Sequence, residues 1–243
     1  MSPCVLEVAA NSVASSCAAQ AGGAGRVELC SALELGGVTP SWATIAMARE
    51  RLRIPLYVLV RPRAGDFLYD DLECETMLRD IEACANLGCD GVVIGVLDAD
   101  GNVDMARCRP LVAAAGDMGV TFHRAFDHAS DQARALEDVV GLGCERVLTS
   151  GGRPRATQAV DAIRALVVQA GDRLSVMPGA GVNADNLAQL ARATGAREFH
   201  ASAKRQHPSG MRIRARLDDM AAGEVRSDEQ AVRAMAAVLR DLA

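Results

Sequence analysis

The sequence lacks a long apolar run and an excess of positive charge. No apolar stretch approaches the roughly 20 residues that a membrane-spanning helix needs. The N-terminus, MSPCVLEVAANS, has neither a basic region nor a long apolar region, so we expect no signal peptide and a cytoplasmic protein. The formal net charge of -5 argues against nucleic acid or an anionic membrane as a partner.

The eight cysteines lack the spacing of a metal or disulfide framework. No C-x-x-C pair and no cysteine and histidine cluster at zinc-like spacing occurs. A chain with a large core in a reducing compartment does not need disulfides, so we expect free thiols. With 243 residues, of which 50% are hydrophobic, we expect a single domain over residues 1–243.

Four segments of the chain resemble one another and begin at Gly23, Gly88, Gly143 and Gly195. Each starts with a glycine suited to ending a helix and continues into an extended apolar run. Further strand-like runs are CVLEVAA, PLYVLVRP, GVTFHRAF and RLSVMPGAG. Helical periodicity marks linking stretches such as residues 41–51, 70–87, 104–115, 155–170 and 183–193. Eight strands that alternate with helices predict a closed parallel (β/α)8 barrel, the TIM-barrel fold.

One connection breaks this pattern. After the eighth strand, residues 203–226 include Pro208, Gly210 and several basic residues, and a final helix follows in SDEQAVRAMAAVLRDL. A Ser or Asp could cap the start of that helix. Connections of such length are usually functional or disordered, so we expect a long loop before the C-terminal helix.

Polar residues fall where a barrel would bring them together. In the overlay of the four segments, Glu28 is in register with His200, and Cys30 is in register with Ser150 and Ser202. If Val27 and its equivalents face the helices, these two columns face the barrel axis. At the ends of other strands, or just beyond them, lie Glu7, Arg61, Arg63, Asp66, His123, Arg124 and Asp127. Barrel enzymes carry their chemistry at this C-terminal mouth.

Two interpretations of these side chains remain open. In the first they form a ligand site, with His123, Glu28 and Asp66 as candidate acids or bases and with Arg61 and Arg63 as clamps for an anion. In the second, a closed salt-bridge network only fills the barrel, and its members are Glu7, Glu28, Arg61, His123 and Arg124. Buried ion pairs stabilise a fold poorly compared with apolar packing, so we favour the site.

Two glycine-rich turns add to the ligand-site interpretation. TSGG follows the sixth strand and MPGAGVN the seventh, and their amides can face an anion together with a helix that begins near Asn183. The loops after strands seven and eight are the usual phosphate site of this fold. The basic residues Lys204, Arg205, Arg212 and Arg214 favour the same ligand. The expected ligand-binding residues are Glu7, Arg61, Arg63, Arg124, Ser150, Gly151, Gly179, Gly181, His200 and Ser202.

The chain resembles the CutC copper homeostasis family nearly from end to end. The resemblance rests on RVELCSALELGGVTPS, RPRAGDFLYDD, GVLDADGNVDMARC, VTFHRAFD, ERVLTSG, MPGAGV and EFHASA. It implies a cytoplasmic barrel with a role in copper handling. Cu(I) prefers thiolate and thioether ligands, so Cys30 in the VELC motif is the candidate metal ligand, within reach of Met177 or His200. Ala9 stands where family members commonly carry a second cysteine.

Two hypotheses for the function follow. The resemblance implies a copper homeostasis protein that binds Cu(I). The residues alone favour an enzyme that acts by acid and base catalysis on a small phosphorylated or carboxylated metabolite. The expected partner is accordingly a small anionic ligand or Cu(I), and we also expect the protein to form a homo-oligomer.

Overall fold

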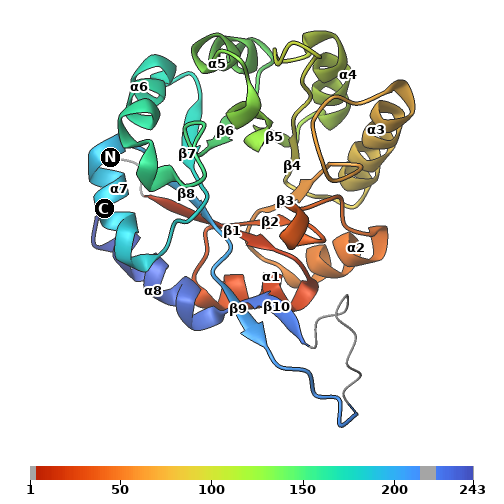
Figure 1. The fold of residues 1–243 in the computed structure, drawn as a ribbon. Coiled ribbons are helices and arrows are strands. Elements are labelled where there is room, and N and C mark those ends of the chain that lie inside the picture. The colour runs from red at the N-terminus through yellow and green to blue at the C-terminus, as the bar shows by residue number, and fades with distance from the viewer. Residues whose placement is uncertain (1–3, 214–222, 243) are drawn as a thin grey trace.

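The structure is a computed structural model that describes residues 4–213 and 223–242. Its central feature is a ring of eight parallel strands with helices outside (Figure 1). The strands are β1 (Val5–Ala10), β2 (Arg26–Leu29), β3 (Leu56–Leu59), β4 (Gly91–Ile94), β5 (Gly119–Phe122), β6 (Arg146–Thr149), β7 (Ser175–Pro178) and β8 (Glu198–Ala201). Consecutive strands pair from β1 to β7, and β8 pairs with β1. The ring is nearly closed, and the predicted (β/α)8 barrel is confirmed.

Helices alternate with these strands, as the periodicity predicts. They are α1 (Val13–Gly22), α2 (Trp42–Arg51), α3 (Asp71–Asn86), α4 (Met105–Ala115), α5 (Gln132–Gly141), α6 (Val160–Ala170), α7 (Ala184–Thr194) and α8 (Glu229–Arg240). The expected cap of the last helix is Asp228, which accepts a hydrogen bond from the amide of Ala231 at 2.9 Å. The expected helix over 155–170 starts later, because Ala159 leaves the helical conformation and the amide of Ala156 bonds to the carbonyl of Ala180.

The strands alternate as the overlay predicts. Val27 and its equivalents Val92, Val147 and Phe199 belong to the core between the sheet and the helices. A second cluster of buried side chains contains Cys30, Tyr57, Leu59 and Val93, which lie on the opposite face of their strands, inside the barrel. The Glu28 column therefore faces the barrel axis.

The long loop expected before the last helix contains regular structure that the sequence analysis did not predict. Strands β9 (Lys204–His207) and β10 (Glu224–Ser227) pair antiparallel and form a ribbon that leaves the barrel (Figure 1). The amide of Ser227 donates to Ser15 Oγ at 3.1 Å, and its hydroxyl donates to the carbonyl of Ala9. These bonds attach the ribbon to the first βα unit. Arg214 lies outside the described residues.

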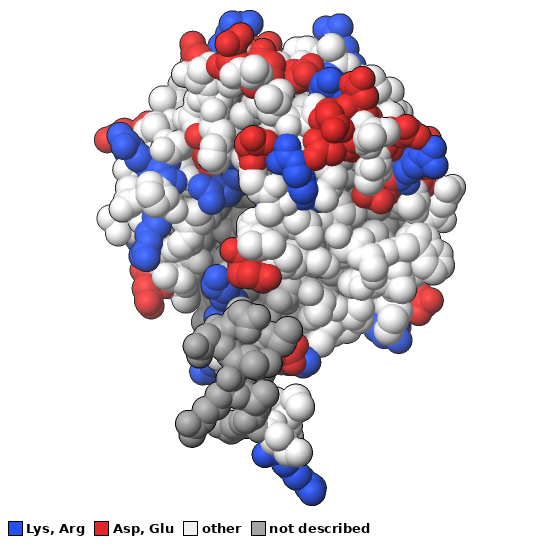
Figure 2. Space-filling view, turned by 45° about the vertical axis from the view of Figure 1, so that its right-hand side comes forward, with Lys and Arg blue, Asp and Glu red and all other residues white. Residues whose placement is uncertain are grey.

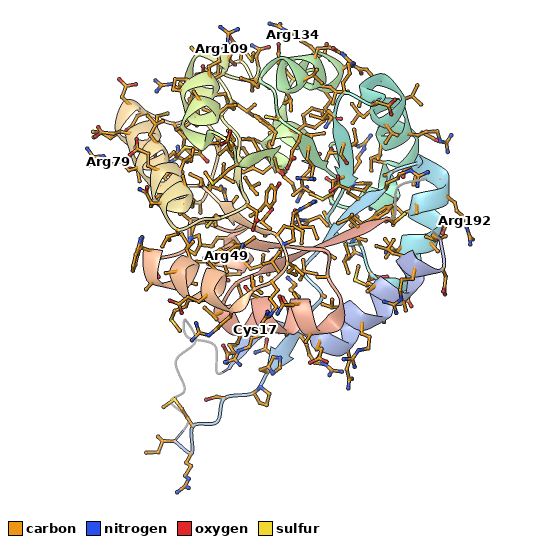
Figure 3. All side chains as sticks on the ribbon, turned by 180° about the vertical axis from the view of Figure 1, so that it is seen from behind. Cys17, Arg49, Arg79, Arg109, Arg134 and Arg192 are labelled. Atoms are coloured by element: carbon orange, nitrogen blue, oxygen red, sulfur yellow. The ribbon has the colours of Figure 1, made fainter. Side chains whose placement is uncertain are left out.

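The surface carries charges of both signs. Figure 2 shows acidic and basic side chains interspersed, with the surface hollowed near the middle of the view. Arg79, Arg109, Arg134 and Arg192 point outward from the ring of helices (Figure 3). Within the described part of the chain, no helix has both the length and the apolar character required to cross a lipid bilayer.

Two glycines give a matched test of packing inside the barrel. A Cβ atom added to Gly91 would clash with the ring of Tyr57, whereas one added to Gly141 would meet nothing within 4 Å. We expect Gly91→Ala to lower the free energy of unfolding by about 1–3 kcal/mol through overpacking. Gly141→Ala, at the end of α5, should leave that free energy unchanged or raise it by about 0.5–1 kcal/mol. Urea denaturation measures both, and equal effects would contradict the packing argument.

Candidate functional site

The interior of the barrel is crossed by a buried network of charges. Arg26 forms ion pairs with Glu7 and with Glu198, and Arg146 Nε lies 2.7 Å from Glu198 Oε2. Arg26, Arg146 and Glu198 were missed by the sequence analysis. Each stands two residues before an inward-facing position of its strand, so the two-residue alternation could have found them. Because this network is paired, it supports the side chains above it rather than binding a ligand.

Glu7 links the network to the mouth of the barrel. Its side chain is completely buried, and Oε1 lies 2.7 Å from Nδ1 of His200. Burial alone would raise the pKa of Glu7, but Arg26 and His200 hold it at about 2. An ionised Glu7 can only accept a hydrogen bond, so Nδ1 of His200 carries a proton and is the donor of this hydrogen bond. Glu7 does not engage Nε2 of His200, and the His200 side chain lines the cavity described below.

Glu28 is the titratable carboxyl of the mouth. Its Oε2 atom is buried without a hydrogen-bond partner among the described residues and lies 3.9 Å from Nδ1 of His200. Burial raises the pKa of Glu28 to about 7, and the negative charge of Glu7 adds to the rise while His200 opposes it. Burial in turn lowers the pKa of His200, yet Glu28 and Glu7 more than compensate and raise it. Glu28 can therefore gain or lose a proton near neutral pH.

His123 has the opposite arrangement of its ring nitrogens. The amide of Ala125 donates to Nδ1 of His123 at 3.1 Å, so this nitrogen holds a lone pair and the ring is neutral with its proton on Nε2. Burial and the nearby charge of Arg61 lower the pKa of His123 to about 3. Nε2 of His123 is buried and has no hydrogen-bond partner in the part of the chain that the structure describes. His123 thus offers a single N–H donor.

Arg61 is positioned by backbone carbonyls. Its Nη1 atom donates to Leu35 at 3.0 Å and Gly37 at 2.8 Å, and Nη2 donates to Gly65 at 2.7 Å. The guanidinium carbon also lies 5.1 Å from the centre of the Phe67 ring. Nε is buried and has no hydrogen-bond partner within residues 4–213 and 223–242. Arg61 therefore shapes the loops of the mouth and keeps one N–H group that no described residue accepts.

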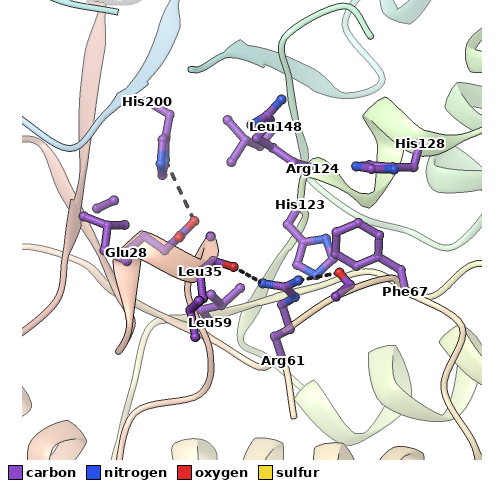
Figure 4. A pocket seen from close by; sticks show the side chains of 14 residues that line it. Glu28, Leu35, Leu59, Arg61, Phe67, His123, Arg124, His128, Leu148 and His200 are labelled. Atoms are coloured by element: carbon purple, nitrogen blue, oxygen red, sulfur yellow. Dashed lines mark hydrogen bonds and ion pairs between the residues drawn. The ribbon is translucent and has the colours of Figure 1, made fainter. Parts of the chain in front are cut away.

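These side chains surround one cavity of about 240 Å³ (Figure 4). Its lining includes Glu28, Arg61, Phe67, His123, Arg124, Leu148 and His200. In Figure 4, Glu28 and His200 point toward one another, and the ring of His123 lies beside the Arg61 guanidinium. The sequence predicts that four side chains meet at one opening, and the structure brings them there: Glu28, Arg61, His123 and His200.

A second cavity of about 510 Å³ adjoins the first and shares Arg124 and His200 with it. It lies at the loops after β7 and β8, and its lining includes Arg155, Gly181, Asn183, Ser202 and Lys204. Asn183 caps α7 by accepting from the amides of Asp185 and Asn186, so those two amides already have partners. Arg155 and Lys204 form no ion pair with any described residue. Arg155 packs on Gly181 and was missed by the sequence analysis.

Other expected residues lie away from both cavities. Arg63 pairs with Glu73 and with the exposed Asp66, and neither Arg63 nor Asp66 lines a cavity at the mouth. Their positions are set by the loop before α3, which strand alternation does not describe. Arg63 and Asp66 therefore support the start of α3.

The remaining expected ligand residues build the loops instead. The amide of Ser150 donates to Asp127, and the amide of Gly151 donates to Thr149 Oγ1 at 2.9 Å. Gly179 bonds to the carbonyl of Thr149 and leaves no space for a side chain against Leu148. These three residues position the strand ends, because their amides are already occupied within the protein.

The donors at the mouth do not fit Cu(I). Cys30 is completely buried, and burial raises the pKa of its thiol, with the charge of Glu28 adding to the rise. The Met177 sulfur contacts Arg26 Nη2 at 3.5 Å inside the barrel. The described donors that converge there within 4.8 Å of one another are Glu7, Glu28 and His200. Carboxylates and imidazole suit harder ions, whereas Cu(I) selects sulfur.

Comparisons with known proteins agree on one family. The sequence profile of the CutC family matches residues 4–205. A family protein CutC from Xanthomonas campestris pv. campestris is 62% identical over 199 residues, which are 82% of this chain and 83% of the relative. One from Chromobacterium violaceum is 56% identical over 210 residues, 86% of this chain and 85% of the relative.

Solved structures support the same fold. A candidate copper homeostasis protein, CutC, from Streptococcus agalactiae has a TM-score of 0.79 and 32% identity, over 82% of this chain and 98% of its own. Thiamine phosphate pyrophosphorylase from Pyrococcus furiosus has a TM-score of 0.61 over 98% of this chain and 96% of its own. Its identity of 12% shows a shared barrel and no more.

The raised pKa of Glu28 predicts how stability depends on pH. The folded chain holds this proton up to about pH 7, whereas an exposed glutamate loses it near 4.5. The stabilisation is complete below pH 4.5 and is lost as the pH rises through 7. Between pH 5 and pH 8, urea denaturation should therefore show wild type losing up to about 3 kcal/mol relative to Glu28→Gln.

Glu7 does not disturb this comparison, because its depressed pKa makes its contribution constant above pH 4.5. Glu75→Gln on the exposed face of α3 is the matched control and should follow wild type. Parallel stability curves for wild type and Glu28→Gln would contradict the assignment of Glu28.

Proposed function

We propose that this chain, which belongs to the CutC family, binds a small phosphorylated or carboxylated ligand at the mouth of its (β/α)8 barrel. There it catalyses a proton transfer to or from the bound ligand. The observation that carries the proposal is a set of three buried polar atoms that have no hydrogen-bond partner among the described residues and that belong to side chains lining one cavity. They are Glu28 Oε2, Arg61 Nε and His123 Nε2. An unpaired buried polar group costs about 1–3 kcal/mol, which a bound ligand can offset.

The two N–H groups suit an oxygen atom that becomes negative during a reaction. His123 is a neutral donor, and Arg61 brings a positive charge beside it. Donors fixed before the reaction stabilise a developing oxyanion without reorganisation. Because the ring of His123 is neutral, it can donate a hydrogen bond while keeping its proton.

Glu28 is the group that accepts or returns the proton. A carboxyl with a pKa of about 7 is partly ionised at neutral pH, which suits a general base. The arrangement favours removal of a proton from a carbon next to a carbonyl, with Glu28 as the base and with His123 and Arg61 holding the carbonyl oxygen. Glu7 and His200 act as positioning residues, since they set the charge beside Glu28.

The adjoining cavity suits the anionic end of the ligand. Arg155 and Lys204 supply positive charge there, and Arg124 and His200 lie between the two cavities. Cations grouped around a concave site strengthen phosphate and carboxylate binding. A phosphorylated carbonyl compound would place its phosphate by β7 and β8 and its reacting carbon by Glu28.

Copper homeostasis is a second candidate function, which the name of the Streptococcus agalactiae protein supports. Glu7, Glu28 and His200 do not supply the soft ligands of Cu(I), so we do not assign Cu(I) to the mouth. All eight cysteines are free, which agrees with the proposed cytoplasmic location. We also propose a homo-oligomer, which light scattering on the purified protein tests directly.

Binding at the mouth can be tested with defined anions. Phosphate, oxalate and 2-phosphoglycolate should each raise the melting temperature, and 2-phosphoglycolate most, because it can occupy both cavities. Arg155→Gln with Lys204→Gln should reduce the response to phosphate and 2-phosphoglycolate while leaving that to oxalate. Asp66→Asn, outside the cavities, is the control, and a wild-type protein that responds to none of the three anions would exclude the anion site.

Proton transfer needs a separate measurement. Dihydroxyacetone phosphate in D2O should exchange its carbon-bound protons in the presence of the protein, as followed by ¹H NMR. Glu28→Gln and His123→Gln should each slow this exchange by about 100-fold or more, the usual effect of losing a base or an oxyanion donor. Exchange at the wild-type rate in Glu28→Gln would rule out Glu28 as the base.

A further inference from the structure

The loop after β2 carries apolar side chains to the mouth of the barrel. An antiparallel bridge between Ser31 and Val38 closes this loop, and a short 3-10 helix, η1 (Leu33–Leu35), lies within it. The guanidinium of Arg61 donates to two carbonyls of the same loop, those of Leu35 and Gly37. The loop is therefore held over the mouth by a residue of the proposed site.

The backbone of this loop adopts a conformation that its sequence does not favour. Ala32 has a φ of 48° and a ψ of 55°, in the left-handed region that a residue with a Cβ atom enters only at a cost. Ala32 directly precedes η1, whose Leu33 and Leu35 both line the first cavity. Backbone strain of this kind persists where surrounding contacts impose it, and it is common at ligand sites. The two leucines are thus brought to the cavity at an energetic cost.

Leu35 does not contribute to the core. Its side chain is 55% exposed, and it belongs to neither hydrophobic cluster of the described residues. A single exposed leucine on an open surface is ordinary. Leu35 instead lines the same cavity as Glu28 and His123. Packing within the chain therefore does not explain its position, whereas contact with a ligand does.

Phe67 adds an aromatic ring to this side of the cavity from the loop after β3. The ring centre lies 5.0 Å from that of His123 and 5.1 Å from the guanidinium carbon of Arg61. In Figure 4, Leu35 and Phe67 lie on either side of that guanidinium. The apolar wall of the cavity is the set Leu33, Leu35, Leu59 and Phe67. The donors of His123 and Arg61 are thus bordered by carbon atoms.

The apolar wall and the cationic groups lie at different ends of the combined site. Leu35 and Phe67 line the first cavity only, whereas Arg155 and Lys204 line the second only. Strand β3, which leads to Phe67, lies opposite β7 in the ring of strands. A ligand that spans both cavities and places its anionic group by β7 therefore directs its other end toward the apolar wall.

We propose that the ligand carries an aliphatic or aromatic group at the end opposite its phosphate or carboxylate, and that this group packs against Leu35 and Phe67. The inference rests on the proposed function and narrows its substrate class to amphipathic carbonyl compounds. Each methylene buried against the wall raises the affinity by about fourfold. The group also shields the donors of His123 and Arg61 from water, which strengthens the hydrogen bonds that they make.

The test is isothermal titration calorimetry with inorganic phosphate and with methyl, n-butyl and n-hexyl phosphate. Wild type should bind hexyl phosphate about 10-fold or more tightly than methyl phosphate, because only the longer chain reaches the apolar wall. Leu35→Ser should lose most of this ratio and keep the wild-type affinity for methyl phosphate. Leu72→Ser is the matched control, since Leu72 is exposed on α3 and lines neither cavity. It should keep the ratio.

The two ends of the ligand can be separated by a second variant, Arg155→Gln combined with Lys204→Gln. It should weaken methyl and hexyl phosphate by the same factor, because the changed residues line the second cavity only. Thermal unfolding of each variant establishes that it is folded. If Leu35→Ser does not fold, the heat-capacity change of binding to wild type replaces it, and this change should be more negative for hexyl than for methyl phosphate.

Equal affinities of wild type for methyl and hexyl phosphate would overturn the apolar subsite and leave the anion site intact. The subsite is also overturned if Leu35→Ser keeps the ratio or if Leu72→Ser loses it. Binding of hexyl phosphate without binding of phosphate or methyl phosphate would support the apolar wall and contradict the anion site of the proposed function. Binding of none of the four compounds would overturn both.

Discussion

The ion pair of Arg26 and Glu7 is the interaction on which the mouth of the barrel depends. Glu7 has no exposure to water, and it stays ionised because Arg26 lies against one of its oxygens. The other oxygen fixes a proton of His200 on Nδ1. The charge of Glu7 also discourages ionisation of Glu28. A buried ion pair of this kind stabilises the fold poorly, but it sets the protonation of His200 and Glu28 at the mouth of the barrel.

The two histidines of the mouth perform different tasks because their Nδ1 atoms have different partners. His200 donates from Nδ1 to a carboxylate, so burial does not prevent it from holding a positive charge. His123 accepts at Nδ1 from a backbone amide, so it remains neutral. Glu28 belongs to the charged side of the cavity, and Arg61 with His123 forms the donor side. A ligand between them meets a base on one side and two N–H groups on the other.

The sequence predicted what depends on the two-residue period of a strand. Glu28, His200 and His123 are placed by alternation, and so is the barrel itself. Arg63 and Asp66 follow a strand in a loop, where hydrogen bonds to nearby groups rather than periodicity decide the direction of a side chain. The β9 and β10 ribbon depends on pairing between segments far apart in the chain, which a local pattern does not reveal.

The two ends of the barrel carry different kinds of side chain for a physical reason. At the mouth, parallel strands end in loops, so inward positions are free of packing and can carry oxygen and nitrogen donors. At the opposite end, each helix must close tightly onto the next strand, so its corners select small apolar residues. Cysteine is both small and apolar, so Cys89 and Cys144 satisfy that packing. The barrel can therefore gather oxygen and nitrogen donors around the cavity of Glu28 while apolar packing closes its opposite end.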